Sequence, residues 1–247
     1  HRATFYAVKL VTKQLRLGDV IYPSDIGCYT LGIQPPYNEA DYLLCMGSSV
    51  GTGGGFSIST KQKIISFIGD STFFHAGIPG LINAVHNNHK FLLIILDNRT
   101  TAMTGHQPNP GVPFNGMREP AKEIDIEKLV KAIGVEYVKT VDPYDLKNTI
   151  IAIREALQRD GLSVIISKRE CALLRDAEMI KLGKWVRYQV NQDKCTKCMN
   201  CILNYSCPAF YLDPEGRVMI DPVLCDGCGV CALPQVCGFK AIEKVEE

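Results

Sequence analysis

Long apolar runs are missing from this 247-residue sequence. The longest strongly apolar run, residues 91–96, is far shorter than the roughly 20 residues that a membrane-spanning helix needs. An excess of charge is missing too: 27 basic residues stand against 26 acidic ones, so neither a nucleic-acid partner nor a membrane surface is indicated. No secretory signal is visible. Because the sequence begins with His1 rather than Met, we expect a piece of a longer protein, and this last absence excludes little.

Cysteine, in contrast, is abundant and unevenly spread. Eight of the eleven cysteines lie in the last quarter of the sequence. In a small secreted protein such a number would indicate disulfides. Here the eight follow a metal-ligand pattern, which favours a reducing cytoplasm.

The centre of the sequence is a predicted strand–helix–strand unit at residues 64–98. Two runs rich in Ile, Leu and Phe are typical of buried parallel strands, and the segment between them has helical length. Each run ends in a polar pair, Gly69-Asp70 and Asp97-Asn98, at the edge where an open α/β sheet binds ligands. Asp70 and Asn98 would therefore reach one Mg²⁺ with oxygen atoms. The two residues after Asp70 open a helix, whose free N–H groups favour an anion such as a phosphate.

Strand and helix patterns alternate over the first two thirds of the chain. Helices and strands are predicted at residues 1–16, 19–22, 124–133, 135–141, 143–158 and 162–167. This alternation predicts an α/β fold with a doubly wound parallel sheet. Residues 43–56 are rich in glycine, which weakens a helix and suggests close approach of the backbone to a cofactor or another helix. Phe56 occupies the third glycine position of GxGxxG, so no dinucleotide fingerprint is assigned.

The spacing of GDS and DN, and the extension DNRTTAMTGHQPNP, resemble the thiamine-diphosphate motif of the 2-oxoacid:ferredoxin oxidoreductases. Within that family the sequence is similar to the C-terminal part of the large (alpha) subunit in the indolepyruvate branch. Two positions depart from the general motif, because Ser71 stands where Gly is usual and Asp97 where Asn is usual. Neither is the position of an expected metal ligand.

The resemblance implies thiamine diphosphate and Mg²⁺ as cofactors, with the backbone carbonyl of Thr100 as a third Mg²⁺ ligand beside Asp70 and Asn98. It also implies cofactor contacts in three segments, with Met46-Gly47-Ser48 beside the aminopyrimidine ring. The implied cofactor-binding residues are Asp25, Ile26, Gly27, Cys28, Met46, Gly47, Ser48, Gly69, Asp70, Ser71, Thr72, Asn98, Thr100, Met103 and Thr104.

Two residues are candidates for a catalytic role, and each has a plain structural alternative. Cys28 lies at the predicted rim of the sheet, near the thiamine rings by resemblance, but it is equally well a small buried thiol. His106, in MTGHQ, would contact the substrate, although a lone histidine is more often solvated or simply hydrogen-bonded. Gln107 belongs to the same predicted cofactor loop.

The last quarter contains an internal repeat of cysteines. The pattern C-x2-C-x2-C-x5-C occurs at Cys195–Cys207 and again, displaced by 30 positions, at Cys225–Cys237. Cysteines at this spacing hold [4Fe–4S] clusters, and in two-cluster ferredoxins the fourth cysteine of each run ligates the other cluster. Zinc sites use paired CxxC motifs instead. The expected ligand sets are Cys195, Cys198, Cys201 and Cys237 for one cluster, and Cys225, Cys228, Cys231 and Cys207 for the other.

The expected domains are a thiamine diphosphate- and Mg²⁺-binding domain at residues 1–183 and a small α+β domain like a bacterial ferredoxin at residues 184–247. A charged link at residues 174–184 would join them.

The resemblance implies oxidative decarboxylation of an aryl 2-oxoacid, such as indolepyruvate, with coenzyme A as acyl acceptor and an external ferredoxin as electron acceptor. It also implies a pyrimidine-binding region N-terminal to this sequence and a smaller (beta) partner subunit, without which the chain should not turn over. Two alternatives remain open: an oxidoreductase for pyruvate or a branched-chain 2-oxoacid, and an electron-transfer module that no longer turns over a substrate.

Overall fold

The computed structural model describes residues 1–245, which form two compact units. The first unit contains Ala3–Glu170 together with His1, and the second begins at Cys171. The contacts thus divide the chain 13 residues before the predicted limit at 183/184, because a helix that the sequence analysis did not foresee belongs to the second unit. None of the helices in residues 1–245 has both the length and the apolar character needed to cross a bilayer.

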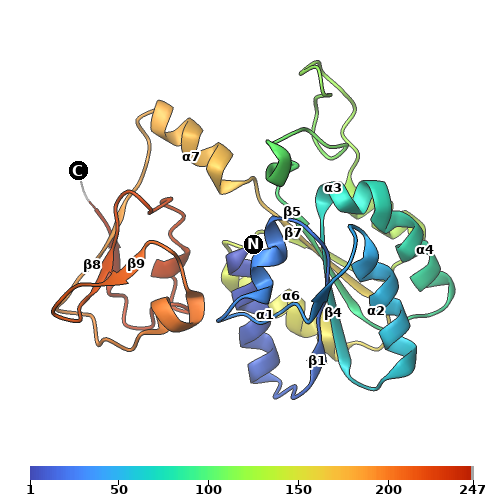
Figure 1. Cartoon of the computed structure of the whole chain (residues 1–247), viewed down its shortest axis with the longest axis horizontal. Coiled ribbons are helices and arrows are strands. Elements are labelled where there is room, and N and C mark those ends of the chain that lie inside the picture. Colours follow the sequence, from blue (N-terminus) through green and yellow to red (C-terminus); the bar gives the residue numbers. More distant parts are fainter. Residues whose placement is uncertain (246–247) are drawn as a thin grey trace. The chain divides into compact units, whose positions relative to one another are not determined.

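The first unit is built on a five-stranded parallel sheet (Figure 1). Its strands lie in the order β1-β4-β5-β7-β6, and every neighbouring pair is parallel. Their bounds are Val20–Ile21 for β1, Lys63–Gly69 for β4, Leu92–Asp97 for β5, Tyr137–Val141 for β6 and Ser163–Lys168 for β7. The α/β class and the parallel sheet predicted from the sequence are confirmed.

Helices cover both faces of this sheet, as Figure 1 shows. One face packs against α2 (Ser48–Ser59), α4 (Ile78–His86) and α5 (Ile126–Ile133), whose buried side chains join those of the strands in one apolar cluster. The other face packs against α1 (Arg2–Gln14) and α6 (Leu146–Gln158). On that face the Phe5 ring lies 4.8 Å from the Phe67 ring, centroid to centroid. Strands β4, β5 and β7 are therefore buried on both faces, which explains their nearly continuous apolar sequences.

The glycine-rich segment forms helix α2 despite its low helical propensity. A Cβ atom on Gly53 would lie 2.3 Å from the Ser66 hydroxyl oxygen, and one on Gly54 would lie 2.3 Å from Nδ1 of His89. These two glycines let α2 approach β4 and the α4–β5 connection. The close approach predicted from the glycines therefore involves a strand and a histidine side chain.

A helix follows β4 without interruption. It comprises α3 (Asp70–Thr72), a π-helical segment η2 (Phe73–Gly77) and α4. Short elements around the same edge of the sheet complete the unit: β2 (Pro23–Ser24), β3 (Tyr42–Leu43), η1 (Cys28–Ile33) and η3 (Ala102–Thr104). Strands β2 and β3 pair in parallel beside the main sheet.

The second unit contains two small antiparallel ladders. Strand β8 (Tyr188–Val190) pairs with β11 (Ile242–Lys244), and β9 (Phe210–Leu212) pairs with β10 (Val218–Ile220). Two short helical turns carry cysteines, η4 (Cys201–Tyr205) and η5 (Val230–Ala232). Few apolar side chains are buried here apart from cysteines, and most of them are small, such as Ala209, Val218 and Val230. A core of this size provides little stability, which is typical of domains that fold around a metal centre.

The predicted charged link is wrong as a description of residues 174–184. Most of these residues belong to helix α7 (Ala172–Lys181). No glycine or proline interrupts the sequence from Ala172 to Leu182, and Gly183 follows with a left-handed φ of 63°. The charged residues alternate with leucine, isoleucine and methionine, so the high charge does not prevent a helix.

Candidate functional site

The carboxyl ends of β4 and β5 bring the predicted metal ligands together. The two strands pair in parallel with Gly69 opposite Leu96, so Asp70 and Asp97 leave the sheet side by side. The terminal amide of Asn98 points toward two oxygens of its neighbours. The inward-facing atom of this amide lies 2.6 Å from the Thr100 carbonyl oxygen and 3.2 Å from Oδ1 of Asp70 when it is the nitrogen.

Three oxygen atoms meet at this point only when the amide oxygen of Asn98 faces inward. If the Asn98 amide is turned by 180°, its NH₂ group donates to both neighbouring oxygens. With the oxygen inward, the same three groups would offer oxygen ligands to a divalent cation such as Mg²⁺. The three residues that the sequence analysis assigned to Mg²⁺ therefore fit such an ion.

Asp70 is 3 % exposed and has further polar neighbours besides Asn98. Its Oδ2 accepts a hydrogen bond of 2.9 Å from Nδ2 of Asn109, whose own Oδ1 accepts from the backbone N–H of Gly111. Burial, and after it the negative charge of Asp97, raise the pKa of Asp70 to about 7. The sequence analysis missed Asn109, although its place between two prolines of the QPNP segment marks a residue held in a fixed loop.

A cavity of about 100 Å³ opens beside these oxygens. Its lining includes twelve of the fifteen predicted cofactor-binding residues: Ile26, Gly27, Cys28, Met46, Gly69, Asp70, Ser71, Thr72, Asn98, Thr100, Met103 and Thr104. They come from four segments that are separate in the sequence. The sheet topology thus gathers the predicted residues around one hollow, at the edge where open α/β sheets bind ligands.

The three remaining predicted residues lie behind this lining. Asp25 is fully buried, and its carboxylate accepts hydrogen bonds from the backbone N–H of Ser49 and from the hydroxyls of Ser48 and Ser49. Gly47 has a left-handed φ of 91°, and a Cβ atom there would lie 2.5 Å from Cβ of Ala76. These contacts hold the start of α2 in place and so position Met46 at the cavity. A direct cofactor contact of Asp25, Gly47 or Ser48 stays a prediction.

Tyr29 also lines the cavity, and sequence reasoning did not single it out. It is 4 % exposed, and burial raises the pKa of its hydroxyl above the ordinary range. A Cβ atom on Gly27 would lie 2.2 Å from a Tyr29 ring carbon, and one on Gly69 would lie 2.8 Å away. Both glycines are therefore needed because the Tyr29 ring fills the space where their side chains would stand.

His106 and Gln107 are absent from the residues that line the cavity within 1–245. The backbone N–H of Thr101 donates to the Gln107 carbonyl, and the Gln107 side chain bonds Thr104 at its hydroxyl and its carbonyl, 2.6 Å each. Gln107 thus shapes the loop that carries Met103 and Thr104. His106 has a left-handed φ of 63°, and its substrate contact stays a prediction.

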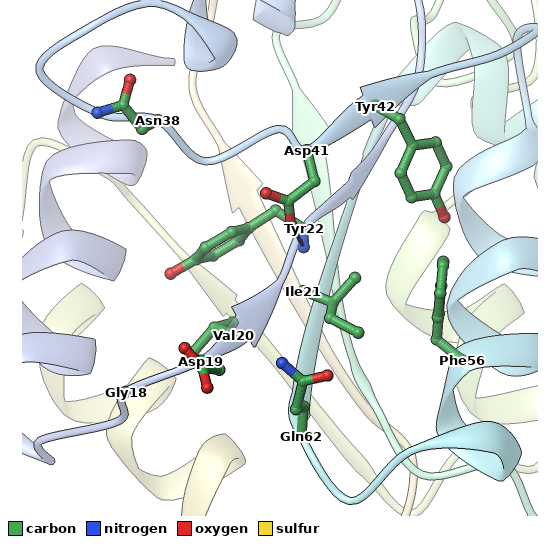
Figure 2. Close-up of a pocket in the computed structure, with 10 residues that line it drawn as sticks. All are labelled: Gly18, Asp19, Val20, Ile21, Tyr22, Asn38, Asp41, Tyr42, Phe56 and Gln62. Carbon is green, nitrogen blue, oxygen red and sulfur yellow. Dashed lines mark hydrogen bonds between the residues drawn. The ribbon is translucent and has the colours of Figure 1, made fainter.

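A second cavity, of about 490 Å³, lies elsewhere in the first unit (Figure 2). It is formed by Gly18–Tyr22 with Asn38, Asp41, Tyr42, Phe56 and Gln62, and it shares no lining residue with the first cavity. The Asp41 side chain is bonded to the residue that follows β1, since its Oδ2 accepts a hydrogen bond of 2.7 Å from the Tyr22 N–H. Asp19 and Gln62 precede β1 and β4, so this hollow adjoins the amino ends of the strands. It is not the crevice where the topology predicts a ligand.

In the second unit, one of the two expected sets of cysteines surrounds a common hollow, and the ligand assignment stays a prediction. Cys195, Cys198, Cys201 and Cys237 line one hollow, together with apolar side chains such as Val218 and Phe239. In the other expected set, burial and then the nearby Cys228, Cys207 and Cys225 raise the pKa of the Cys231 thiol. Within residues 1–245, no three or more His, Cys, Asp or Glu side chains meet closely enough to hold a single metal ion.

Burial dominates the electrostatics of these thiols. It raises the pKa of Cys201 to about 11 and that of Cys228 to about 12, with neighbouring negative groups adding to the effect. Buried thiols without a metal thus stay neutral, whereas iron binds the deprotonated form. Cys45 and Cys171 belong to neither group.

Comparison with known proteins decides the family. Residues 25–167, more than half of the chain, match the model of the thiamine pyrophosphate enzymes, C-terminal TPP binding domain. The chain belongs to the thiamine pyrophosphate enzymes. The matched region runs from Asp25 to Ser167 in β7 and contains the three candidate Mg²⁺ ligands.

Two curated relatives are named indolepyruvate oxidoreductase subunit IorA. The chain is 53 % identical to the one from Methanothermobacter thermautotrophicus, with 98 % of this chain and 38 % of that protein covered. It is 46 % identical to the one from Pyrococcus abyssi, with 100 % and 40 % covered. The chain therefore spans about two fifths of the length of these relatives.

Among solved structures, the chain has a similar fold to a 2-oxoglutarate:ferredoxin oxidoreductase from Magnetococcus marinus, solved with 2-oxoglutarate, coenzyme A and succinyl-CoA bound. The TM-score is 0.63 at 15 % sequence identity, with 68 % of this chain and 61 % of that chain covered. At this identity the match supports the fold.

Proposed function

We propose that the first unit binds the diphosphate of thiamine diphosphate through one Mg²⁺ ion. The convergence of Asp70, Asn98 and the Thr100 carbonyl on one point is the observation that carries this proposal. Ser71 and Thr72 begin the helix after β4, so their backbone N–H groups are available to an anion at the same edge. The part of the cavity beside the thiamine rings would be lined by polarizable sulfur-containing side chains, those of Met46, Met103 and Cys28.

The second unit is proposed to carry two [4Fe–4S] clusters with crossed ligand sets. Cys195, Cys198, Cys201 and Cys237 would hold one, and Cys225, Cys228, Cys231 and Cys207 the other. The two groupings of thiols described above support this assignment. Such ligation requires a reducing compartment, and we propose the cytoplasm as the location.

Together these parts favour oxidative decarboxylation of a 2-oxoacid. Thiamine diphosphate, when bound, supplies an electron sink that makes loss of CO₂ from a 2-oxoacid favourable. The net reaction would convert a 2-oxoacid, coenzyme A and two oxidised ferredoxins into an acyl-CoA, CO₂, a proton and two reduced ferredoxins. The residues of this chain would orient the diphosphate, exclude water around Tyr29 and provide a route for single electrons. The relatives named for indolepyruvate favour an aryl 2-oxoacid as the substrate.

The rest of the site is proposed to come from other parts of the enzyme. A cavity of about 100 Å³ is smaller than the few hundred Å³ typical of sites that enclose a cofactor, as expected when one wall of the site is elsewhere. The missing wall would be a pyrimidine-binding region N-terminal to this sequence, which would supply the glutamate that activates the aminopyrimidine. A smaller partner subunit would complete the assembly, and no nucleic-acid or membrane partner is proposed.

A panel of 2-oxoacids tests the substrate proposal. The chain, combined with the remaining part of the large subunit and with the partner subunit, should reduce ferredoxin fastest with indolepyruvate or phenylpyruvate. Pyruvate, 2-oxoglutarate and a branched-chain 2-oxoacid serve as matched alternatives at equal concentration, with coenzyme A present. A higher kcat/KM on pyruvate or the branched-chain acid would move the substrate to another branch of the family. Absence of turnover with every acid, despite bound cofactor, would favour the electron-transfer module.

A further inference from the structure

Asp97 is the buried residue at this edge that the metal site does not explain. It ends β5, is 2 % exposed, and stands where the general thiamine-diphosphate motif has asparagine. Its Oδ1 accepts a hydrogen bond of 3.1 Å from the backbone N–H of Arg99, which shapes the turn leading to Thr100. An asparagine could accept the same bond through its amide oxygen. The turn therefore needs an oxygen acceptor at this position, but it does not need the negative charge of an aspartate.

Asp97 lies beside Asp70, because the two residues follow paired positions at the ends of β4 and β5. Both carboxyl groups are almost completely buried, and the charge of Asp97 contributes to the raised pKa of Asp70. Two neighbouring buried carboxyl groups repel one another strongly when both are ionised.

Among residues 1–245, no lysine or arginine forms an ion pair with Asp70 or Asp97. Arg99 pairs with Glu123 at 2.9 Å, Lys168 reaches the same glutamate at 4.0 Å, and Arg169 pairs with Asp142. The nearby cations are thus engaged with other carboxylates, and neither Asp70 nor Asp97 forms an ion pair in the described part of the chain. A buried carboxylate pair without a counter-charge is stable only when a cation or a proton is present.

We propose that Asp97 is a positioning residue for the metal ion, acting as a second negative charge behind Asp70 that strengthens binding of a divalent cation. This inference rests on the proposed Mg²⁺ site and extends it to a residue outside the ligand set. The second charge would strengthen binding of the cation and at the same time oppose binding of the anionic diphosphate. Its effects on the two ligands therefore have opposite signs.

The test is the variant Asp97→Asn in the full chain, with Mn²⁺ as a paramagnetic probe and thiamine diphosphate present. Mn²⁺ titrations followed by electron paramagnetic resonance should show a dissociation constant raised about tenfold, a usual effect of removing an outer-shell partner. At saturating Mg²⁺, the affinity for thiamine diphosphate measured by calorimetry should be unchanged or higher. Asp160→Asn removes an exposed carboxylate that pairs with Lys90 and should leave both constants unchanged.

The outcomes separate this inference from the site on which it rests. An unchanged Mn²⁺ constant in Asp97→Asn, with normal binding in the unsubstituted chain, would refute the role of the charge alone. Equal weakening of Mn²⁺ and thiamine diphosphate would show a structural role in the Arg99 turn and would also refute it. If the unsubstituted chain bound no Mn²⁺ with thiamine diphosphate, the metal site and this inference would both be wrong.

Discussion

Replacing Asp70 with alanine should abolish Mg²⁺-dependent binding of thiamine diphosphate. Asp70 is the one carboxylate among the three proposed metal ligands, and the other two donate neutral oxygens, which hold Mg²⁺ poorly by themselves. We expect the affinity measured by calorimetry in the presence of Mg²⁺ to fall by at least about 100-fold, the upper range for removing a metal-site partner.

The substitution should leave the first unit folded. Asp70 is buried beside a second carboxyl group, and burial raises its pKa, so the folded state gains little from its ionised form. The far-ultraviolet circular dichroism spectrum and the melting temperature should match those of the unsubstituted chain. Asp160→Ala, at an exposed aspartate paired only with Lys90, is the control and should bind normally. Undiminished affinity in Asp70→Ala would remove Asp70 from the metal site.

Removing Cys207 should eliminate the cluster whose other ligands begin at Cys225. The chain with both clusters should contain about eight iron atoms, and Cys207→Ala about four. Pairs of substitutions identify the affected cluster by iron content alone. Cys207→Ala combined with Cys225→Ala should retain about four iron atoms, because both changes affect one cluster. Cys207→Ala combined with Cys195→Ala should retain almost none.

The reverse pattern in the two double variants would contradict the crossed pairing. Cys237→Ala provides the matched test, since it should behave as a member of the group of Cys195. Cys45→Ala, at an exposed cysteine outside both groups, should retain all the iron. Loss of a cluster should also lower the stability of the second unit, which buries few apolar side chains of its own.

Much of the site could be predicted because its residues follow a strong local pattern. Asp70 and Asn98 each follow a buried strand, and parallel strands bring such positions to one edge whatever the details of packing. The cysteine groups were predictable for a similar reason, because a repeat of ligand spacings is visible without knowledge of the fold. The glycines of α2 indicated close packing correctly, although not which residues approach them.

The missed features depend on contacts between segments distant in the sequence. Asn109 bonds Asp70 across 39 positions, and the space needed by the Tyr29 ring explains Gly27 and Gly69 only once the chain is folded. Helix α7 was not predicted, because a high density of charged residues is also typical of a link between domains. The charged side chains reflect the exposure of this helix to solvent, and charge by itself does not exclude a helix.

The most direct test of the central claim is whether a 2-oxoacid reduces the clusters through bound thiamine diphosphate. Under anaerobic conditions the visible absorbance of oxidised [4Fe–4S] clusters is followed after indolepyruvate is added to the chain with Mg²⁺ and thiamine diphosphate. The account predicts no enzymatic bleaching with this chain alone. Bleaching should appear when the remaining part of the large subunit and the partner subunit are added, and it should be lost in Asp70→Ala. Rapid bleaching by this chain alone would contradict the divided site, and no bleaching in the complete assembly would contradict the coupling of decarboxylation to the clusters.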